Sequence, residues 1–237
     1  MKLKILGVGL DVMNITESIG KISGFLKSEN QHYVVTVNPE FLVAAQKNPN
    51  FKTVLNQASL AICDGVGLVL ASGGQLKRVT GVDLSEKLLA GEISGCKIFL
   101  LGGAGENAKI LMTKYSPIVV GAETGGLVNS QTWLLDNNEI IIRKINDSGA
   151  NILLVGFGQV KQEMWLSQNL DKLPNIKVAM GVGGTFDYLS GHTKRAPKFI
   201  RVMGWEWLFR LIIQPRRFGR IFNATIKFVW LLTFSNK

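Results

Sequence analysis

Residues 96–108 read CKIFLLGGAGENA and join an apolar run to a glycine-rich turn and the start of a helical pattern. An unbroken apolar run bounded by a turn is typical of a strand buried on both faces of a parallel sheet. Residues 103–108 fit the pattern G-x-G-x-x-A, in which glycines let the backbone approach phosphates and the following helix presents N–H groups. The segment therefore predicts a parallel α/β sheet, with a turn that either contacts a nucleotide or only joins a strand to a helix.

The same alternation of apolar strand and helical pattern extends along most of the chain. Thr16 is expected to cap the first helix, and Pro39 occupies the first position of the second, where a missing N–H costs nothing. The predicted fold class is α/β: a Rossmann-like, mostly parallel sheet with helices on both faces. Strands are expected at residues 3–12, 32–38, 59–63, 96–103, 118–122, 151–157 and 176–183. Helices are expected at residues 16–29, 39–48, 106–114, 130–147 and 160–170, with another starting within 65–72.

Ligands of such sheets bind beyond the carboxyl ends of the strands, so the polar residues there are the first candidates for a site. From the residues alone, Thr36 and Asn38 are explained by an ordinary helix cap. Asp64 can be either a cap or a general base. Glu123 stands where a ribose-binding acid would follow the glycine turn. The candidates at this rim are Asp11, Asn14, Thr36, Asn38, Asp64 and the glycine turns at 102–105, 156–158 and 181–184.

Charge is distributed unevenly along the 237 residues. The whole chain has a net charge of +10, and residues 192–237 contain ten Lys or Arg but a single acid, Glu206. The last fifth therefore holds almost all the excess charge, which indicates an anionic partner such as phospholipid, nucleic acid or a phosphorylated substrate. We place a boundary near residue 192, with an α/β domain at 1–191 and a basic appendage at 192–237.

The appendage pattern is both basic and aromatic. No stretch approaches the roughly 18 apolar residues of a membrane span, so binding to the surface of an anionic membrane is favoured over crossing it. Two helical patterns meet at Pro215, and the first either packs against the body or enters the interface. In the second, Phe222, Ile226, Val229 and Trp230 fall on one face.

Several common sites are missing from the sequence. There is no D-x-D, H-x-x-x-H or CxxC pattern, no P-loop and no G-x-S-x-G elbow, so we expect no metal site and no cofactor. Cys63 and Cys96 lie in apolar runs and are expected to be buried thiols in a reducing compartment. His32 and His192 are isolated and are not expected to be catalytic.

Six blocks in order resemble the WecG/TagA/CpsF family of bacterial glycosyltransferases, over about residues 4 to 230. The blocks are TVNPEFLVAAQKNPNF, AICDGVGLVLAS, RVTGVDL, FLLGGAGENA, GFGQVKQEMW and the long run from Gly181 to Arg220. The resemblance implies transfer, with inversion and without a metal, of an N-acetylmannosamine-type sugar from UDP to a polyprenyl-diphosphate-linked GlcNAc. It also implies a bacterial cytoplasmic enzyme, peripheral on the inner face of the membrane, in teichoic acid or envelope polysaccharide synthesis.

The resemblance also assigns roles to residues of this chain. Asp64 is similar to the family's catalytic base, with Thr36 and Asn38 beside it as the other catalytic candidates. Substrate is expected to bind the glycine turn, through Gly102, Gly103 and Gly105. It is also expected to bind the blocks around Gly183, Asp187 and Arg195. Arg78 looks like an arginine near the donor, and Gln162 like a residue at the nucleotide end of the pocket. The expected cations over the diphosphate are Arg216, Arg217 and Arg220.

Two other classes of protein remain as alternatives at this point. A nicotinamide-dependent oxidoreductase would explain the G-x-G-x-x-A pattern but not the basic appendage. A nucleic-acid-binding protein would explain the charge, with aromatic side chains stacking on bases. We expect no nucleic acid partner; a homo-oligomer is compatible with the sequence.

Overall fold

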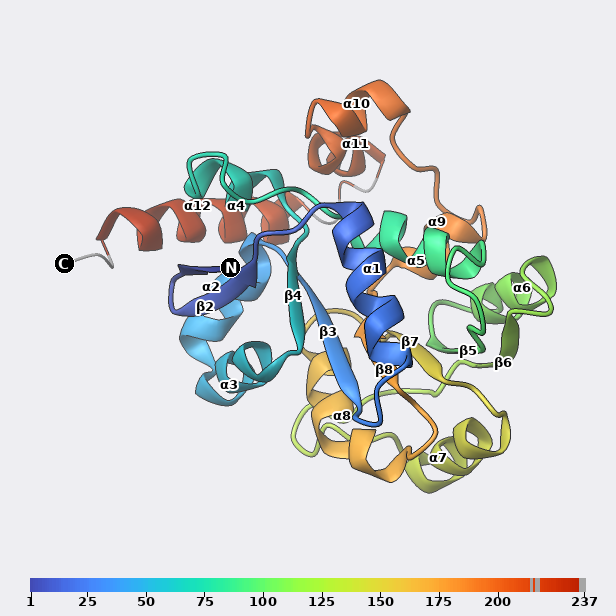
Figure 1. Cartoon of the computed structure of the whole chain (residues 1–237). Helices are drawn as coiled ribbons and strands as arrows, with labels where there is room; N and C mark the ends of the chain where they lie inside the picture. The colour runs from blue at the N-terminus through green and yellow to red at the C-terminus, as the bar shows by residue number, and fades with distance from the viewer. Residues whose placement is uncertain (214, 216–217, 235–237) are drawn as a thin grey trace.

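The computed structural model describes residues 1–213, 215 and 218–234, and leaves the side chains of Val202, Arg210, Arg220 and Asn223 outside the description. At its centre is a six-stranded parallel sheet of order β4-β3-β8-β7-β5-β6 (Figure 1). The chain leaves β3 toward β4 and leaves β5 toward β6, in opposite directions, so the middle of the sheet is where a ligand crevice is expected. The strands are β3 (His32–Val37), β4 (Leu60–Cys63), β5 (Ile98–Gly102), β6 (Val119–Glu123), β7 (Ile152–Gly156) and β8 (Val178–Gly181).

Helices cover both faces of this sheet, which confirms the predicted fold class. Alternate residues of one strand enter different cores: Val34 of β3 packs on one face, whereas Val35 and Val37 pack on the other. The first face carries α1 (Ile15–Leu26), α5 (Gly81–Leu89), α6 (Asn107–Lys114) and α9 (Thr185–Leu189). The second carries α2 (Pro39–Lys47), α3 (Pro49–Gln57), α7 (Asn138–Asp147) and α8 (Lys161–Asn169), with the short α4 (Val66–Ala71) and η1 (Leu170–Lys172) beside it.

The first predicted strand, 3–12, is wrong. These residues form a separate antiparallel hairpin, β1 (Lys2–Ile5) and β2 (Val8–Asp11), outside the parallel sheet. The two turn residues, Leu6 and Gly7, have φ of +49° and +79°. Positive φ at both positions is the signature of the tight hairpin turn whose twist matches the strands. Leucine rarely adopts this conformation, so the sequence signal for the turn was weak.

Short polar side chains begin the helices, as their chemistry favours. Asn14, not the predicted Thr16, caps α1, and its side chain and that of Glu17 bond reciprocally to each other's backbone N–H. Asn38 caps α2 with Pro39 at the first helical position, as the cap interpretation predicted. Thr80 caps α5, a helix that the sequence analysis did not predict.

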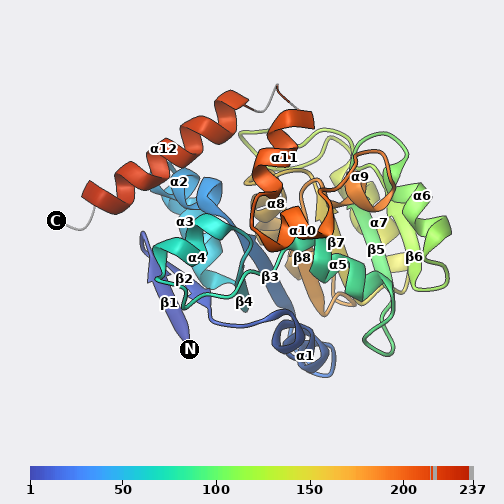
Figure 2. The ribbon, with the colours of Figure 1, turned by 90° about the horizontal axis from the view of Figure 1, so that it is seen from above.

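Beyond residue 192, the described residues form α10 (Lys198–Val202), α11 (Glu206–Ile213) and α12 (Phe218–Phe234). Figure 1 and Figure 2 show α10 and α11 over the carboxyl ends of the strands and α12 along α2. Gly204, before α11, approaches the body so closely that a Cβ there would lie 2.8 Å from Val66 Cγ2. On α12, Phe228 is buried against the body, while the predicted apolar face with Phe222 and Trp230 is exposed.

Phe228 is therefore expected to hold α12 on the body. Phe228→Ala should weaken the docking of α12 on the body by about 3 kcal/mol, because a buried aromatic ring is lost and a cavity remains. Native-state hydrogen exchange of the α12 amides measures this directly. Phe222→Ala, on the exposed face of the same helix, is the matched control and should change exchange little. Equal effects of the two variants would contradict the packing described.

Candidate active site

The rim of the sheet brings together two of the three predicted catalytic residues. Thr36 is the next-to-last residue of β3, and its hydroxyl donates to the carbonyl of Gly181, at the end of β8, over 3.4 Å. Asp64 follows β4 and its Oδ2 accepts the backbone N–H of Gly81 at 2.9 Å. A Cβ on Gly81 would lie 3.3 Å from Thr36 Oγ1 and 3.5 Å from Asp64 Oδ2. Thr36 and Asp64 thus face the same point, the start of α5.

The third predicted catalytic residue, Asn38, has a structural task in this fold. Its Oδ1 accepts the N–H of Phe41 at 3.1 Å and so caps α2. Asn38 lies one residue beyond β3, next to Gly65. A Cβ on Gly65 would lie 2.9 Å from the Pro39 ring. Asn38 is therefore close to the Asp64 segment, and a role for it toward substrate stays a prediction.

The glycines predicted to bind substrate divide into two kinds. Gly102 and Gly103 have positive φ, and a Cβ on them would lie 2.8 Å from the Gly156 carbonyl carbon and 2.9 Å from the Phe186 ring. Chain packing alone explains these two. Gly105 and Gly183 also have positive φ, but a Cβ there would meet nothing within 4 Å. Only the second pair leaves open space in which a ligand could approach the backbone.

Gln162, predicted at the nucleotide end of the pocket, is instead enclosed by protein. Its side chain is buried, with Nε2 donating to Glu163 Oε1 at 2.6 Å and Oε1 accepting the Gly183 N–H at 2.9 Å. Glu163 is also buried, and burial raises the pKa of its carboxyl to about 8, although hydrogen bonds from Gln162 and from backbone N–H groups oppose the rise. The sequence analysis missed Glu163, although it follows Gln162 directly.

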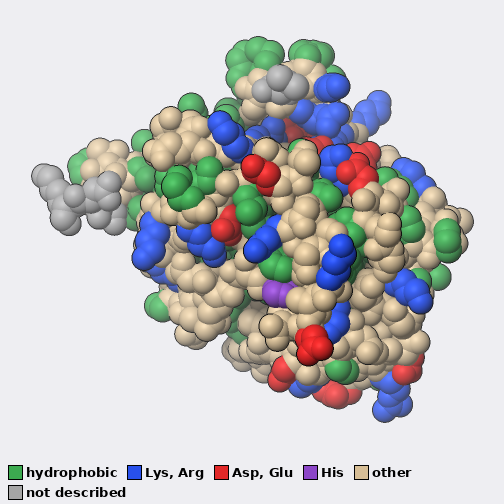
Figure 3. Space-filling view, viewed as in Figure 1, with side chains coloured by type: hydrophobic (Ala, Val, Ile, Leu, Met, Phe, Trp, Pro, Cys, Tyr) green, Lys and Arg blue, Asp and Glu red, His purple; other side chains and the backbone are tan. Residues whose placement is uncertain are grey.

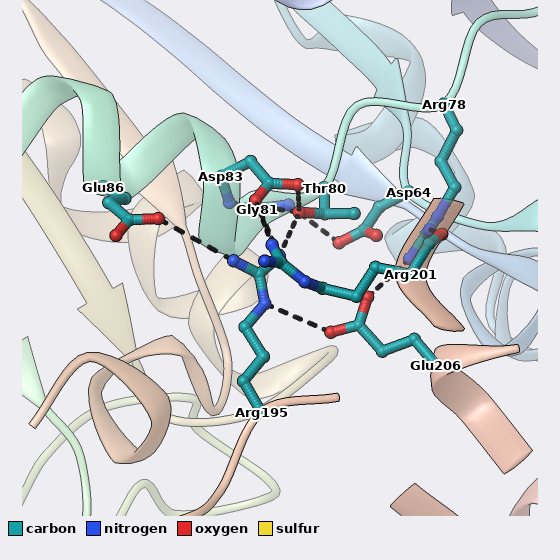
Figure 4. A network of polar contacts seen from close by, with 9 residues as sticks. All are labelled: Asp64, Arg78, Thr80, Gly81, Asp83, Glu86, Arg195, Arg201 and Glu206. Carbon is teal, nitrogen blue, oxygen red and sulfur yellow. Dashed lines mark hydrogen bonds and ion pairs between the residues drawn. The ribbon is translucent and has the colours of Figure 1, made fainter. Parts of the chain in front are cut away.

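Arg78 and Arg195, both predicted to bind substrate, take part in one ion network (Figure 4). Glu206 lies between them, with Oε2 at 2.7 Å from Arg78 Nη2 and Oε1 at 3.3 Å from Arg195 Nε. Arg78 also donates to the carbonyl of Arg201 at 2.8 Å. The only acid of residues 192–237 thus fastens the C-terminal helices to the body. Its isolation in a basic segment was a signal that could have singled it out.

Asp83 is the second acid of this network. It accepts from Arg195 Nη2 at 2.7 Å and from Arg201 Nη1 at 3.4 Å, and Glu86 lies 3.8 Å from Arg195 Nη1. Burial alone would raise the pKa of Asp83, but the Thr80 hydroxyl and the two guanidinium groups outweigh it and lower that pKa. Burial works against the charge of Arg195 too, yet the pKa rises because Asp83 and Glu206 stabilise the cation.

A cavity of about 420 Å³ opens beside this network. It lies between α5, the segment before it and the start of α1, and its lining includes Ile15, Arg78, Asp83 and Lys87. The network is therefore reached from open space on one side. Within the described residues, no three His, Cys, Asp or Glu side chains converge as a metal site would require.

The remaining predicted residues have varied positions. Asp187 accepts a hydrogen bond of 2.7 Å from Asn107 Nδ2, at the start of α6, and so ties α9 to the glycine turn. Arg216 and Arg217 lie outside the described residues. Arg220 is in α12, and its side chain is likewise outside the description.

Three further candidates, Asp11, Asn14 and Glu123, lie elsewhere or have other partners. Asp11 is not at the rim: it lies beside the edge strand β4, where its carboxylate accepts the N–H of Ala61 at 2.9 Å. Asn14 caps α1. Glu123 ends β6, where it pairs with Lys144. These contacts account for all three side chains through the fold itself.

Comparison with known proteins covers both the rim and the C-terminal helices. The model of the glycosyl transferase WecG/TagA/CpsF family matches residues 3–237. The chain is 31% identical over 236 residues to N-acetylglucosaminyldiphosphoundecaprenol N-acetyl-beta-D-mannosaminyltransferase of Staphylococcus aureus (strain MRSA252). The alignment covers 95% of this chain and 90% of that protein. The similarity is therefore not confined to the sheet.

Glu163 gives the fold a characteristic dependence on pH. Its pKa is about 8 in the folded chain against an ordinary 4.5, so its contribution to stability is full below about pH 4.5 and is lost as pH rises through 8. Glu163→Gln removes this titration. Between these two pH values, the free energy of unfolding of the variant should rise relative to that of the wild type by up to about 1.4 kcal/mol per pH unit. Urea denaturation at pH 5, 7 and 9 measures the difference.

The control for this prediction is Glu139→Gln, the same change at an exposed site on α7. Its difference from the wild type should stay nearly constant with pH. A constant difference for Glu163→Gln as well would show that the buried carboxyl does not titrate as described.

Proposed function

The chain belongs to the WecG/TagA/CpsF family of glycosyl transferases, and we propose that it moves an N-acetylmannosamine-type sugar from UDP to a polyprenyl-diphosphate-linked GlcNAc. The sugar is N-acetylmannosamine or its uronic acid. The Staphylococcus aureus relative is named for transfer of N-acetylmannosaminyl to N-acetylglucosaminyl-diphospho-undecaprenol. The observation in this chain that carries the proposal is the approach of Asp64 and Thr36 to one residue, Gly81, at the carboxyl ends of β3 and β4.

In the proposed reaction, Asp64 takes the proton of the acceptor hydroxyl as its oxygen attacks the anomeric carbon of the donor sugar. The new bond from acceptor oxygen to carbon forms while the bond from carbon to the UDP oxygen breaks, and UDP leaves with the electron pair. Direct displacement from the face opposite UDP inverts the anomeric configuration. The Gly81 N–H fixes one carboxylate oxygen of Asp64, which orients the base before substrate arrives.

The leaving UDP develops negative charge, which cations and backbone N–H groups must meet. We assign this task to Arg78 and Arg195 with Arg216, Arg217 and Arg220, in a reaction that uses no metal, in keeping with the missing D-x-D in the sequence. Arg78 and Arg195 are paired with acids of their own chain, so the diphosphate shares them with Glu206 and Asp83. The open backbone at Gly105 and Gly183 offers the donor its closest approach to the sheet.

We further propose that residues 1–191 form the catalytic domain, whose site the arginines beyond residue 191 complete, and that residues 192–237 also bind the inner face of the cytoplasmic membrane, where a polyprenyl acceptor resides. Figure 3 shows hydrophobic side chains gathered over α10 and α11, with Lys and Arg directly beneath. An apolar surface bordered by cations suits the boundary between acyl chains and anionic headgroups. No helix among the described residues is long and apolar enough to cross a membrane. The exposed apolar side chains include Phe199, Trp205, Trp207, Ile212, Phe218, Phe222, Ile226, Val229, Trp230 and Phe234.

The two other classes raised by the sequence have no support from the family or the relative. Close contact with Phe186 explains why residue 103 of the G-x-G-x-x-A turn is a glycine. Glu123, the candidate ribose acid, is paired with Lys144. Both features that suggested an oxidoreductase thus have an explanation in the packing of the chain.

Asp64→Asn tests the chemistry. The amide keeps the shape and the hydrogen bond to Gly81 but cannot take a proton, so kcat should fall by about 10²–10⁴-fold. UDP affinity, measured by calorimetry, should stay within about threefold of the wild type. The assay is UDP release from UDP-N-acetylmannosamine with a lipid-diphosphate GlcNAc acceptor. Asp171→Asn, on an exposed turn, is the control. Full activity of Asp64→Asn would exclude Asp64 as the base.

Phe222→Ser with Trp230→Ser tests the membrane face. Each exposed ring that enters the interface contributes roughly 1.5–3 kcal/mol, so binding to phosphatidylglycerol vesicles should weaken at least tenfold. Vesicle sedimentation measures this. Ile110→Ser is the matched control, because Ile110 is similarly exposed but lies on α6, on the opposite side of the molecule (Figure 1). Unchanged vesicle binding by the double variant would rule out this face of α12 as the docking surface.

A further inference from the structure

The turn between β8 and α9 meets the ends of three strands at once. The Gly181 carbonyl accepts from the Thr36 hydroxyl at the end of β3. A Cβ on Gly156, the last residue of β7, would lie 3.0 Å from the carbonyl oxygen of Gly183. Phe186 of α9 packs on Gly103 after β5. The position of residues 181–184 therefore sets how the rim is arranged around Asp64 and the glycine turn.

Gln162 and Glu163 hold this turn from beneath. Gln162 is 2% exposed and Glu163 is fully buried, so neither side chain reaches the open side of the rim. A Cβ on Gly181 would lie 2.4 Å from Glu163 Oε1 and 2.5 Å from Gln162 Nε2, so only glycine fits over the pair. The polar ends of Gln162 both bond inward, Nε2 to Glu163 and Oε1 to the Gly183 N–H.

The orientation of the Gln162 amide depends on Glu163. An amide can present either its oxygen or its NH₂ group in a given direction, and a fixed acceptor on one side selects one of the two. Glu163 Oε1 supplies that acceptor, so the Gln162 oxygen is turned toward the N–H of Gly183. Without the carboxyl, the NH₂ group would lose its acceptor, and only the Gly183 N–H would still favour this orientation of the amide.

The loop that leads into the pair is strained. Val160, at the start of α8, has φ of +69°, a conformation that a β-branched residue rarely adopts. Its carbonyl accepts the N–H of Met164 at 2.9 Å, so the strained residue directly precedes the helical turn that carries Gln162 and Glu163. Strained backbone persists where surrounding contacts determine it, and it gathers at functional sites.

We infer that Gln162 and Glu163 act as one positioning unit, which holds the 181–184 turn in place for sugar transfer while neither side chain touches the donor. The inference rests on the proposed function and deepens it. It also revises the role that resemblance assigned to Gln162, because a side chain with both polar ends used inside the protein acts through Gly183. Glu163 becomes a residue whose loss impairs transfer from beneath the site.

Exchanging the two side chains is the sharpest test. Gln162→Glu alone places two carboxyl groups in contact and should lower kcat at least tenfold. Adding Glu163→Gln restores one amide donor, one acceptor beside it and an oxygen for the Gly183 N–H. The exchanged variant should recover kcat to within about threefold of the wild type. If Gln162 contacts the donor through its amide, the exchanged variant stays as impaired as Gln162→Glu, and the inference is wrong.

Hydrogen exchange gives a readout that does not depend on activity. Glu163→Ala should speed exchange of the Gly183 amide at least tenfold, because the Gln162 amide loses one of the two contacts that hold its oxygen on the Gly183 N–H. Gln168→Ala, on the exposed face of the same helix, is the control and should leave both this rate and kcat unchanged. An unchanged Gly183 rate in folded Glu163→Ala, with Glu163→Met checked in its place should the alanine variant not fold, would overturn the inference.

The two proposals fail in different ways. A wild-type chain that transfers no N-acetylmannosamine-type sugar from UDP would refute the proposed function while the Gly183 exchange rates still tested the positioning unit. A wild-type chain that transfers the sugar, with an exchanged variant that does not recover, would refute the positioning unit alone.

Discussion

Close packing at the carboxyl ends of β5, β7 and β8 depends on the absence of side chains at Gly102, Gly156 and Gly181. A Cβ at any of them would come within about 3 Å of a neighbouring backbone or buried side chain. Their smallness lets the three strand ends and the turns after them share one rim. Gly105, Gly158 and Gly183, which face open space, border that packed region. The site thus has a closely packed floor, formed by the strand ends, with a limited open surface above it.

Charge on the C-terminal helices is organised around the same rim. Residues 192–237 repel one another as a group of cations, yet α10 and α11 lie over the body because Glu206 and Asp83 neutralise Arg78, Arg195 and Arg201. Partly buried pairs of this kind depend on each partner, since removing one leaves an uncompensated charge. A diphosphate bound by these arginines, as we propose, would compete with acids already in place, and its binding would then be coupled to the position of α10 and α11 on the body.

The sequence predicted the parallel sheet because its strands are continuous apolar runs, and it predicted which residues follow them. It did not reveal the β1–β2 hairpin, whose turn relies on a leucine at positive φ rather than on Asn-Gly. Asp64 and Thr36 could be placed together because parallel strands end at one edge. The partners of Arg78 and Arg195 could not be, since Glu206 lies 128 residues from Arg78 and meets it only through tertiary packing.

A motif match and a burial pattern answer different questions about the same residue. Resemblance to the family predicts a role for Gln162 in transfer, whereas its enclosure by Glu163 and Gly183 indicates the route by which we propose that it acts. A group fixed beneath a turn affects the transition state through the distance it sets, and an error near 1 Å in such placement can reduce a rate about 10²-fold. A buried residue can therefore be as necessary as Asp64 without touching the substrate. Its substitutions then report on hydrogen-bond geometry rather than on affinity.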